Sequence, residues 1–383
     1  MTGFQLRKMI VDIFDISTEG DGIGRVYTDE APQGKIVFVP RALPGESVEI
    51  EISEDKGRFM RGRRIDIDDA PVCGGCPLID YPYDRQLAWK EKHVRDCLTR
   101  IAKLEDPKLD PIVGMDDPYH YRNKGEFKIN EGLPYCNINC KDCPIQDPLA
   151  MRIANGFEFK NAEELIVRTN TAGENIAYSV QKSGYMMLQS DKRIINDYIG
   201  HLKIEVDPFS FYQVNTAQCV KLYDLVRENV KDGASVLDLY CGAGTIGLYC
   251  ADKASRVIGV EVVKEAVVQA NRNAVINGIV NATFICGKAE DVVRTKLQGV
   301  KADTVIIDPP RAGCKASLLD TILNIAPETI VYVSCDPATL ARDLKILCGG
   351  SDPQYKFIKA TPVDMFPHTA HVETVVLMSR KDT

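Results

Sequence analysis

The sequence predicts an α/β protein in which a doubly wound parallel-sheet domain follows a small β-barrel and a short cysteine-bearing region. Short strand patterns with Gly and Pro turns fill about the first 65 residues, and a cysteine-rich segment comes next. From about residue 206, strand, turn and helix patterns repeat. A chain of 383 residues exceeds what one hydrophobic core usually supports. We therefore expect three domains, at residues 1–66, 67–205 and 206–383.

The barrel is predicted from alternating apolar and polar residues. Two examples are Gly34-Lys-Ile-Val-Phe-Val-Pro40 and Ser47-Val-Glu-Ile-Glu-Ile52. Alternation with a period of two residues is typical of strands that bury one face. The following run, from Lys56 to Arg64, carries five cations and no anion. It is either a contact for nucleic-acid phosphates or the solvated edge of a strand, and charge runs are more often solvated surface.

The doubly wound domain is predicted from five short apolar runs that are separated by helical patterns. These runs occupy residues 235–240, 256–261, 282–286, 304–308 and 329–334. Two further strands are expected near the end of the chain, at residues 355–360 and 372–379. In sheets of this class, ligands bind at the carboxyl ends of the parallel strands.

Composition excludes several classes of protein. Apolar runs stay well below the roughly 18 residues that a membrane span requires, and the first residues lack the apolar core of a signal peptide. Thirteen cysteines without a secretion signal indicate a reducing compartment, where thiols act as metal ligands, nucleophiles or core residues. We expect a cytoplasmic monomer with no membrane partner. Because the net charge is −7 and phosphate contacts need Lys and Arg, nucleic acid would have to bind at local basic patches.

A nucleotide-binding loop is predicted after the first strand of this domain. The segment Asp238-Leu-Tyr-Cys-Gly-Ala-Gly-Thr-Ile-Gly247 places glycines between a strand and a helix, so that backbone can approach a ligand closely. Nineteen residues after Gly242, Glu261 ends the second strand, where its carboxylate can accept hydrogen bonds from ribose hydroxyls. The spacing fits a dinucleotide or S-adenosylmethionine equally well.

Catalytic residues are predicted where the fourth and fifth strands end, in Asp308-Pro-Pro-Arg311 and Ser334-Cys-Asp-Pro337. Cys335 precedes a predicted helix, whose N-terminus would stabilise a thiolate. Attack of that thiolate on carbon 6 of uracil makes carbon 5 nucleophilic enough to accept a methyl group. A base must then remove the carbon 5 proton, and we expect Glu373, at the start of the last strand, to do so.

The same motifs separate this chemistry from related reactions. Amino-methylating enzymes of adenine or cytosine usually place an aromatic residue after Asp-Pro-Pro, and RNA cytosine-5 enzymes usually place a cysteine there. Here that position is Arg311. A dehydrogenase would explain the glycine loop but not the two later motifs. RNA cytosine-5 methylation and a non-catalytic RNA-binding protein remain as alternatives.

The chain resembles the RNA uridine-5-methyltransferase family, particularly its ribosomal RNA members with an N-terminal TRAM domain. The resemblance rests on the two catalytic motifs and on Gly20-Asp-Gly-Ile-Gly-Arg25, Val37-Phe-Val-Pro-Arg-Ala-Leu-Pro-Gly-Glu46, Phe209-Ser-Phe-Tyr-Gln-Val-Asn215 and His371-Val-Glu-Thr374. It implies an OB-fold-like TRAM barrel, a Rossmann-like class I methyltransferase domain, and S-adenosylmethionine as cofactor.

The resemblance also implies roles for particular residues. Cys335 is the expected nucleophile and Glu373 the expected base. We expect the cofactor to be contacted by six residues, one of which is a glycine of the loop. They are Gln213, Tyr240, Gly242, Thr245, Glu261 and Asp308. A helix over residues 84–104 is expected to pack on the catalytic domain. The TRAM domain favours 23S ribosomal RNA as the structured RNA substrate, with transfer RNA as the alternative.

Many members of this family hold an iron–sulfur cluster, and a [4Fe-4S] cluster is expected here. Three positions of the family pattern match Cys73, Cys76 and Cys143, whereas the first falls on Ile67. The missing thiolate would come from Cys140 or from Cys136. Without the family, the Cys-x2-Cys pairs at 73/76 and 140/143 indicate zinc or iron–sulfur. The other cysteines are expected to pack in the core, namely Cys97, Cys219, Cys241, Cys250, Cys286, Cys314 and Cys348.

Overall fold

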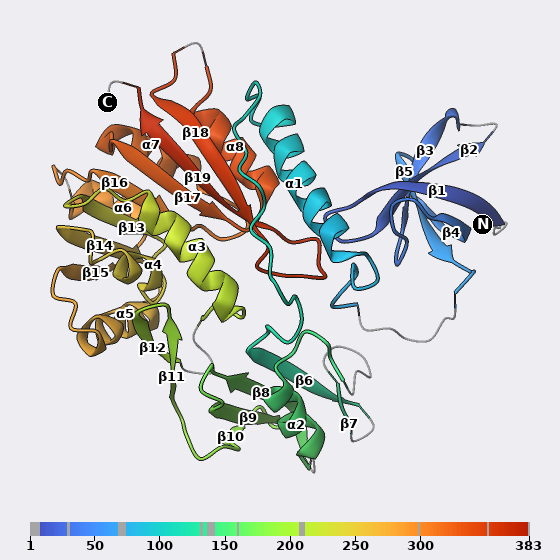
Figure 1. Ribbon diagram of the computed structural model, residues 1–383, viewed down its shortest axis with the longest axis horizontal. Helices are drawn as coiled ribbons and strands as arrows, with labels where there is room; N and C mark the ends of the chain where they lie inside the picture. The colour runs from blue at the N-terminus through green and yellow to red at the C-terminus, as the bar shows by residue number, and fades with distance from the viewer. Residues whose placement is uncertain are drawn as a thin grey trace.

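Figure 1 shows the computed structural model, in which an N-terminal barrel, a large mixed sheet with helices and a smaller sheet form three separate parts. The structure describes residues 8–28, 31–67, 74–130, 133–135, 142–158, 161–206, 211–297, 299–350 and 352–381. None of the helices in these ranges is long and apolar enough to cross a membrane.

The N-terminal strands form the predicted barrel. They close in the order β1-β2-β3-β5-β4, and their bounds are Lys8–Ile16, Gly22–Thr28, Ala31–Val39, Ser47–Asp55 and Phe59–Arg64. Alternate residues such as Val37, Val48 and Ile50 fill the interior, as the period of two requires. At Gly24 an added Cβ would lie 2.2 Å from Cγ1 of Val11, so this close approach of β2 and β1 requires glycine.

Three of the five cations in the run from Lys56 to Arg64 form ion pairs with nearby carboxylates. Arg64 donates to Glu46 at 3.0 Å and to Asp66 at 2.8 Å, and Arg63 reaches Glu51 at 3.1 Å. Lys56 pairs with Glu54. These contacts favour the interpretation of the run as a solvated strand edge over that of a dedicated phosphate site.

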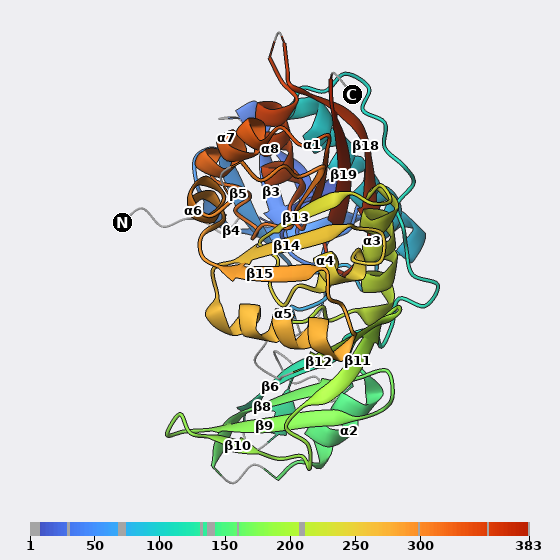
Figure 2. The same ribbon diagram turned by 90° about the vertical axis from the view of Figure 1, so that its left-hand side faces the viewer.

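The large sheet has the predicted strands in the order β15-β14-β13-β16-β17-β19-β18 (Figure 1). Figure 2 shows β15, β14 and β13 side by side. The parallel strands β13 to β17 occupy Ser235–Leu239, Arg256–Glu261, Ala282–Cys286, Thr304–Ile307 and Thr329–Ser334. The last two strands, β18 (Tyr355–Val363) and β19 (Glu373–Arg380), pair antiparallel. Because β19 runs against β17, its first residue lies at the same edge as the carboxyl ends of the parallel strands.

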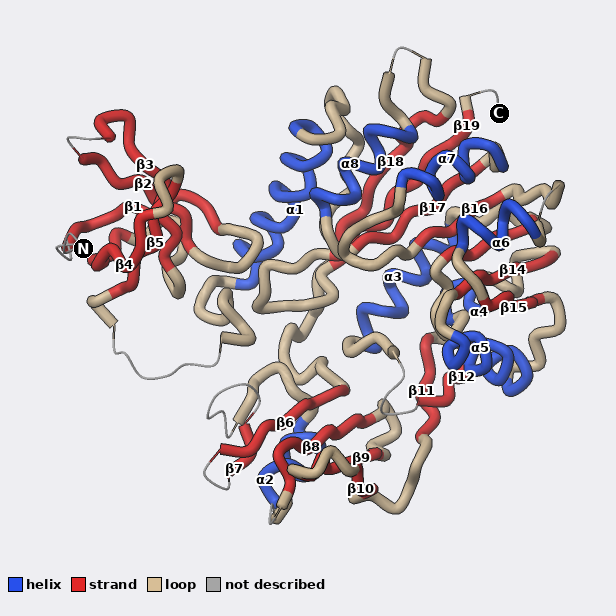
Figure 3. The backbone as a smooth tube through the Cα atoms, turned by 180° about the vertical axis from the view of Figure 1, so that it is seen from behind, coloured by secondary structure: helices blue, strands red, loops and turns tan. Residues whose placement is uncertain are grey.

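Helices cover both faces of this sheet, as Figure 3 shows from behind. One face buries Val236, Ile306 and Val331 against α3 (Thr216–Glu228), α4 (Thr245–Tyr249) and α5 (Lys264–Ile276). The opposite face buries Leu237, Val305 and Ile330. The helices on this face are α1 (Tyr83–Arg100), α6 (Ala289–Thr295), α7 (Ala316–Ile325) and α8 (Pro337–Leu347). Neighbouring residues on each strand thus enter opposite cores, which explains the continuous apolar runs.

Helix α1 precedes the central part of the chain and packs on the large sheet through α8 and β18. Val94, Cys97 and Leu98 enter the core that α8 also enters. Its buried Lys90 pairs at 2.5 Å with Asp364, in the loop between β18 and β19. The helix therefore connects the barrel to an element that lies more than 250 residues later in the sequence.

The central part of the chain forms a second sheet, in the order β10-β9-β8-β6-β7. Its strands β6 to β10 are Lys124–Asn130, Leu133–Tyr135, Ala162–Thr169, Asn175–Gln181 and Met186–Leu188, and α2 (Pro148–Gly156) packs on them. A hairpin of β11 (Ile195–Ile199) and β12 (Leu202–Val206) packs instead with α3 and α5. The domain boundaries at residues 66 and 206 stay predictions.

Candidate active site

A cleft at the carboxyl edge of the large sheet receives residues from all parts of the chain. Thr18 and Glu19 come from the barrel, Arg122 from the segment before the central sheet, and Cys335 and Glu373 from the large sheet. The cavity has a volume of about 1650 Å³. This exceeds the roughly 300–1,000 Å³ of an ordinary small-molecule site, so the cleft has room for a nucleotide beside a cofactor.

The glycine loop that follows β13 forms part of the wall of this cleft. Gly242 and Gly244 have φ angles of 53° and 74°, which favour glycine, and Gly244 precedes α4. Gly247 lies against β13, because an added Cβ would meet Oδ2 of Asp238 at 2.8 Å. That oxygen accepts a hydrogen bond from the Gly247 N–H at 2.9 Å. Burial raises the pKa of Asp238 to about 8.

Glu261 lies at the end of β14, beside this loop. Its Oε2 accepts a hydrogen bond from the Gly242 N–H at 3.1 Å, and its Oε1 accepts one from the Val263 N–H at 2.8 Å. Each carboxylate oxygen has a second lone pair, so Glu261 can still accept hydrogen bonds from a ligand. The structure thus places Gly242 and Glu261 together, as the spacing of nineteen residues predicted.

The other predicted cofactor residues line the same cleft. Thr245 makes a 2.7 Å hydrogen bond to Tyr223, and the Gln213 carbonyl accepts one from Asn123 at 3.0 Å. Tyr240 has a φ of 62°, in the left-handed region that an aromatic residue rarely adopts. Together with the loop, the cleft contains Gln213, Tyr240, Gly242, Thr245, Glu261 and Asp308.

Cys335 follows β17 and precedes α8, as predicted. Asp336 caps α8 by accepting hydrogen bonds from the N–H groups of Ala338 and Thr339, at 2.9 and 2.8 Å. The prediction that the helix N-terminus stabilises a thiolate is wrong for this structure. Burial, with the negative charges of Glu373 and Asp308, raises the pKa of Cys335 to about 11. Desolvation and the nearby carboxylates both favour the neutral thiol.

Glu373 lies next to Cys335 because Thr374 of β19 pairs with Ser334 of β17. Burial, with a smaller effect of Asp308, raises the pKa of the Glu373 carboxyl to about 8. Asp308 directly follows β16, and burial raises its pKa to about 7. Three groups that lose a proton near or above neutral pH therefore share one edge of the sheet.

Arg311 and His371 are site residues to which the sequence analysis assigned no role. Nη2 of Arg311 lies 3.5 Å from Nε2 of His371, and both residues line the cleft. The charge of Arg311 lowers the pKa of both Cys335 and Glu373, against the larger effects that raise them. Their positions within Asp-Pro-Pro-Arg and His-Val-Glu-Thr were the available signal, but no spacing indicated that they meet.

The predicted cluster ligands are described only in part. Cys73, Cys136 and Cys140 lie outside the described residues. Among the residues that the structure describes, there is no group of three or more His, Cys, Asp or Glu that could hold a metal. Cys76 and Cys143 pack in the same core cluster. Tyr121 belongs to that cluster, and its pKa is raised by burial and further by both thiols.

The prediction that the remaining cysteines pack in the core holds for six of them. Buried cysteines of that set are Cys97, Cys219, Cys241, Cys250 and Cys314. Cys348 is half-buried. For Cys286 the prediction is wrong, since this residue ends β15 in an exposed position, where its thiol lies 3.6 Å from the Val262 carbonyl. Strand ends leave the core, which the apolar run alone did not indicate.

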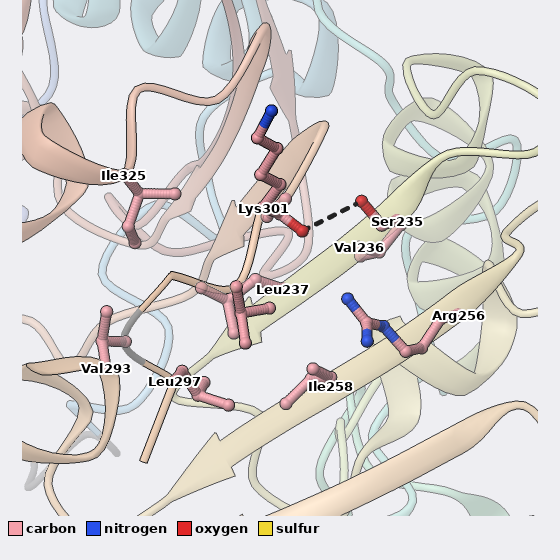
Figure 4. Close-up of a pocket in the computed structure, with 11 residues that line it drawn as sticks. Ser235, Val236, Leu237, Arg256, Ile258, Val293, Leu297, Lys301 and Ile325 are labelled. Carbon is pink, nitrogen blue, oxygen red and sulfur yellow. Dashed lines mark hydrogen bonds between the residues drawn. The ribbon is translucent and has the colours of Figure 1, made fainter. Parts of the chain in front are cut away.

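A second, smaller hollow lies where β13 and β14 begin, at the opposite edge of the sheet (Figure 4). Leu237, Ile258 and Leu297 supply apolar side chains, and the Ser235 hydroxyl donates to the Lys301 carbonyl at 3.3 Å. Its lining has no carboxylate, thiol or histidine. We therefore assign the chemistry to the larger cleft.

Comparisons with known proteins agree with this geometry. A sequence profile described as tRNA (Uracil-5-)-methyltransferase matches residues 195–381, and one described as TRAM domain matches residues 7–65. A protein named uncharacterized RNA methyltransferase from Bacillus cereus is 37% identical, with 96% of this chain and 95% of the relative covered. Another from Halalkalibacterium halodurans is 34% identical, with 97% of each chain covered.

A solved structure matches almost the whole chain. It is the Pyrococcus abyssi tRNA (uracil-54, C5)-methyltransferase in complex with S-adenosyl-L-homocysteine, with a TM-score of 0.76 and 26% identity. The match covers 97% of this chain and 100% of that chain. The barrel, the central sheet and the large sheet are therefore arranged much as in that structure.

The electrostatics of the cleft predict how Cys335 reacts. Its pKa of about 11 predicts slow alkylation by iodoacetamide at neutral pH, because the thiolate is scarce. Near pH 9.5 Glu373 is ionised, so Glu373→Gln removes a negative charge beside the thiol and lowers its pKa. Alkylation of Cys335, followed by mass spectrometry of its peptide, should then be severalfold faster in the variant. The exposed Cys286 serves as the internal control, and equal Cys335 rates would contradict this coupling.

Proposed function

We propose a reaction on the premise that this chain belongs to the RNA uridine-5-methyltransferase family, whose members take the methyl group from S-adenosylmethionine. The chain methylates carbon 5 of a uridine in structured RNA. The observation that carries the proposal is the placement of Cys335 beside Glu373 at the cleft. Family membership sets aside cytosine methylation and non-catalytic RNA binding, the two alternatives that the sequence left open.

In the proposed reaction, Cys335 acts first. Its sulfur forms a bond to carbon 6 of the uracil, and the electron pair of the 5,6 double bond moves toward carbon 5 and the carbonyl. Carbon 5 then takes the methyl group from the sulfonium of S-adenosylmethionine, whose sulfur keeps the electron pair of the broken bond and is left as a neutral thioether. Glu373 removes the proton from carbon 5, the double bond re-forms, and the sulfur leaves as a thiolate. The thiol must lose its proton before attack, and Arg311 favours that ionised form.

We propose that the cofactor lies along the glycine loop. Glu261 ends β14 with lone pairs available for ribose hydroxyls, and Gly242 leaves room for the ligand beside it. The proposed contacts remain those that the sequence predicted, namely Gln213, Tyr240, Gly242, Thr245, Glu261 and Asp308. Their common position at one cleft supports the assignment.

Glu261 gives a direct test of cofactor binding. Glu261→Ala should weaken S-adenosylmethionine binding by about 1.5–3 kcal/mol, because hydrogen bonds to a carboxylate are charge-assisted. Titration calorimetry measures the affinity. Glu265→Ala, a change in the first turn of α5 that also faces the cleft, is the control and should have a smaller effect. Unchanged affinity in a folded Glu261→Ala variant would remove Glu261 from the site.

The order of steps predicts a trapped intermediate. Glu373→Gln should attack and methylate the uridine but fail to eliminate, and so accumulate protein covalently bound to 5-methylated RNA. Denaturing electrophoresis should show a slower band that requires S-adenosylmethionine. Cys335→Ala should bind RNA but give neither methylation nor adduct, and the double variant should also give no band. Turnover of Glu373→Gln at the parental rate would show that another group is the base.

For the RNA target, we propose ribosomal RNA, because of the TRAM barrel. Transfer RNA is the second candidate, because this chain matches the structure of a transfer RNA enzyme. That match covers 97% of this chain and so includes most of the barrel. Mapping 5-methyluridine in ribosomal and transfer RNA from a deletion strain and its parent distinguishes them. We expect loss of a ribosomal site, and loss confined to transfer RNA would overturn the ribosomal assignment.

We also propose that the cysteine segments hold a [4Fe-4S] cluster through Cys73, Cys76, Cys143 and either Cys140 or Cys136. The packing of Cys76 and Cys143 in one cluster supports a shared site. Anaerobically purified protein should contain iron and sulfide and absorb in the visible region. Cys143→Ser should lose both, whereas Cys348→Ser, at a half-buried cysteine in another core, should lose neither. Zinc without iron would refute the cluster but keep a metal site.

A further inference from the structure

The loop after Asp-Pro-Pro is clamped to α8 by one buried carboxylate. Oδ2 of Asp343 accepts hydrogen bonds from the Cys314 N–H and from the Tyr332 hydroxyl, both at 2.8 Å. Oδ1 accepts from Nε and Nη2 of Arg342, at 2.9 and 2.7 Å. Asp343 is fully buried. Both of its oxygens are therefore used to join β17, α8 and this loop.

Arg342 completes the clamp from the solvent side. Its Nη2 donates to the carbonyls of Ala312 and Cys314, at 3.0 and 3.2 Å. Between these residues, Gly313 has a φ of 74°, and an added Cβ would lie 2.5 Å from Nη2 of Arg342. The backbone of the loop thus lies directly on the Arg342–Asp343 pair.

The clamped loop carries Arg311. The Thr339 hydroxyl, on α8, donates to the Arg311 carbonyl at 3.0 Å, so the backbone of Arg311 is tied to the helix that begins behind Cys335. The guanidinium itself is exposed and extends to His371 in the cleft. A shift of the loop away from α8 would therefore move Arg311 relative to both Cys335 and Glu373.

We propose that Asp343, with Arg342, is a positioning residue that holds the Arg311 guanidinium opposite the reacting pair of Cys335 and Glu373. The inference rests on the proposed function for the roles of that pair. Asp343 itself does not line the cleft, so it acts through Arg311.

Charge supports this role as well as geometry. Asp308, at a strand end, and Arg311, in the loop, act electrostatically on both members of the reacting pair, and Glu373 also acts on Cys335. Cys219, on α3, is in turn affected by Asp308 and Glu373. Arg311 is the cation among them, and it lowers the pKa of Cys335 and of Glu373. Displacing it should raise both values.

The test uses Asp343→Asn in the full-length enzyme. An amide oxygen can replace only one of the two carboxylate oxygens, so either Arg342 or the Cys314–Tyr332 side loses its acceptor. We expect kcat to fall by about 10- to 100-fold, the scale of a misplacement of about 1 Å near reacting groups. The acid limb of kcat/KM should move to higher pH, and so should the pH midpoint for alkylation of Cys335.

A matched pair of tyrosine variants separates positioning from stability. Tyr332→Phe removes one hydrogen bond to Asp343, and Tyr355→Phe removes one of the same length, 2.8 Å, to the Pro327 carbonyl in the same core. Both should lower Tm, but only Tyr332→Phe should shift the pH profiles. Should Asp343→Asn fail to fold, these two tyrosine variants still test whether Asp343 positions Arg311.

A double variant tests whether the effect passes through Arg311. Arg311→Gln combined with Asp343→Asn, or with Tyr332→Phe, should have the same pH midpoints as Arg311→Gln alone. Additive shifts, or variants of Asp343 and Tyr332 that lower Tm without moving either pH profile, would overturn the proposal. The alkylation measurement requires no methylation, so failure of the proposed reaction and failure of the clamp give different results.

Discussion

The buried ion pair between Lys90 and Asp364 is the interaction on which the rest of the structure depends. Both side chains are fully buried, and their 2.5 Å contact is the only ion pair of the described residues with no exposure on either side. Burial lowers the pKa of Lys90. Nζ of Lys90 also donates to the Phe366 carbonyl at 3.0 Å, and the Tyr83 hydroxyl donates to Asp364 at 2.8 Å. Removing one partner would leave a buried charge, which costs roughly 3–5 kcal/mol.

This pair holds α1 and the loop between β18 and β19 in one position. Gln86 strengthens the connection, since it accepts from the His368 N–H at 2.9 Å and donates to the Leu78 carbonyl at 2.9 Å. The loop then continues to His371 and Glu373 at the cleft. The position of the proposed base is therefore determined partly by a helix from the first third of the chain.

The barrel is joined to the same assembly. Asp15 accepts hydrogen bonds from Trp89 at 2.8 Å and from Lys92 at 3.0 Å, both on α1. Ile16 packs with Trp89 and with Ala370 of the active-site loop. Because the barrel, α1 and this loop share one small core, the turn with Thr18 and Glu19 is held at the cleft. RNA that binds the barrel would thus meet a surface already fixed relative to Cys335.

A structural feature could be predicted from the sequence when residues close to it in the chain determine it. The strands at 235–240 and 329–334, the glycine loop and Cys335 were predictable, because apolar runs and short motifs determine them over a few residues. The pairing of Lys90 with Asp364 was not, since nothing within either segment indicates a partner 274 residues away. The clamp at Asp343 was missed for the same reason, and the exposure of Cys286 because a strand pattern does not reveal where burial ends.

The pKa of Cys335, the proposed nucleophile, was also beyond sequence reasoning, because it depends on charges that meet only after folding. Asp308, Glu373 and Cys335 have pKa values of about 7, 8 and 11, so at neutral pH Glu373 and Cys335 are largely protonated and Asp308 is partly protonated. A positive charge that enters such a site favours the ionised forms. A sulfonium is positively charged and a neutral thioether is not, so the cleft should ionise more readily with the methyl donor than with its demethylated product. Cofactor charge and catalytic ionisation would then be coupled by the buried acids Asp308 and Glu373.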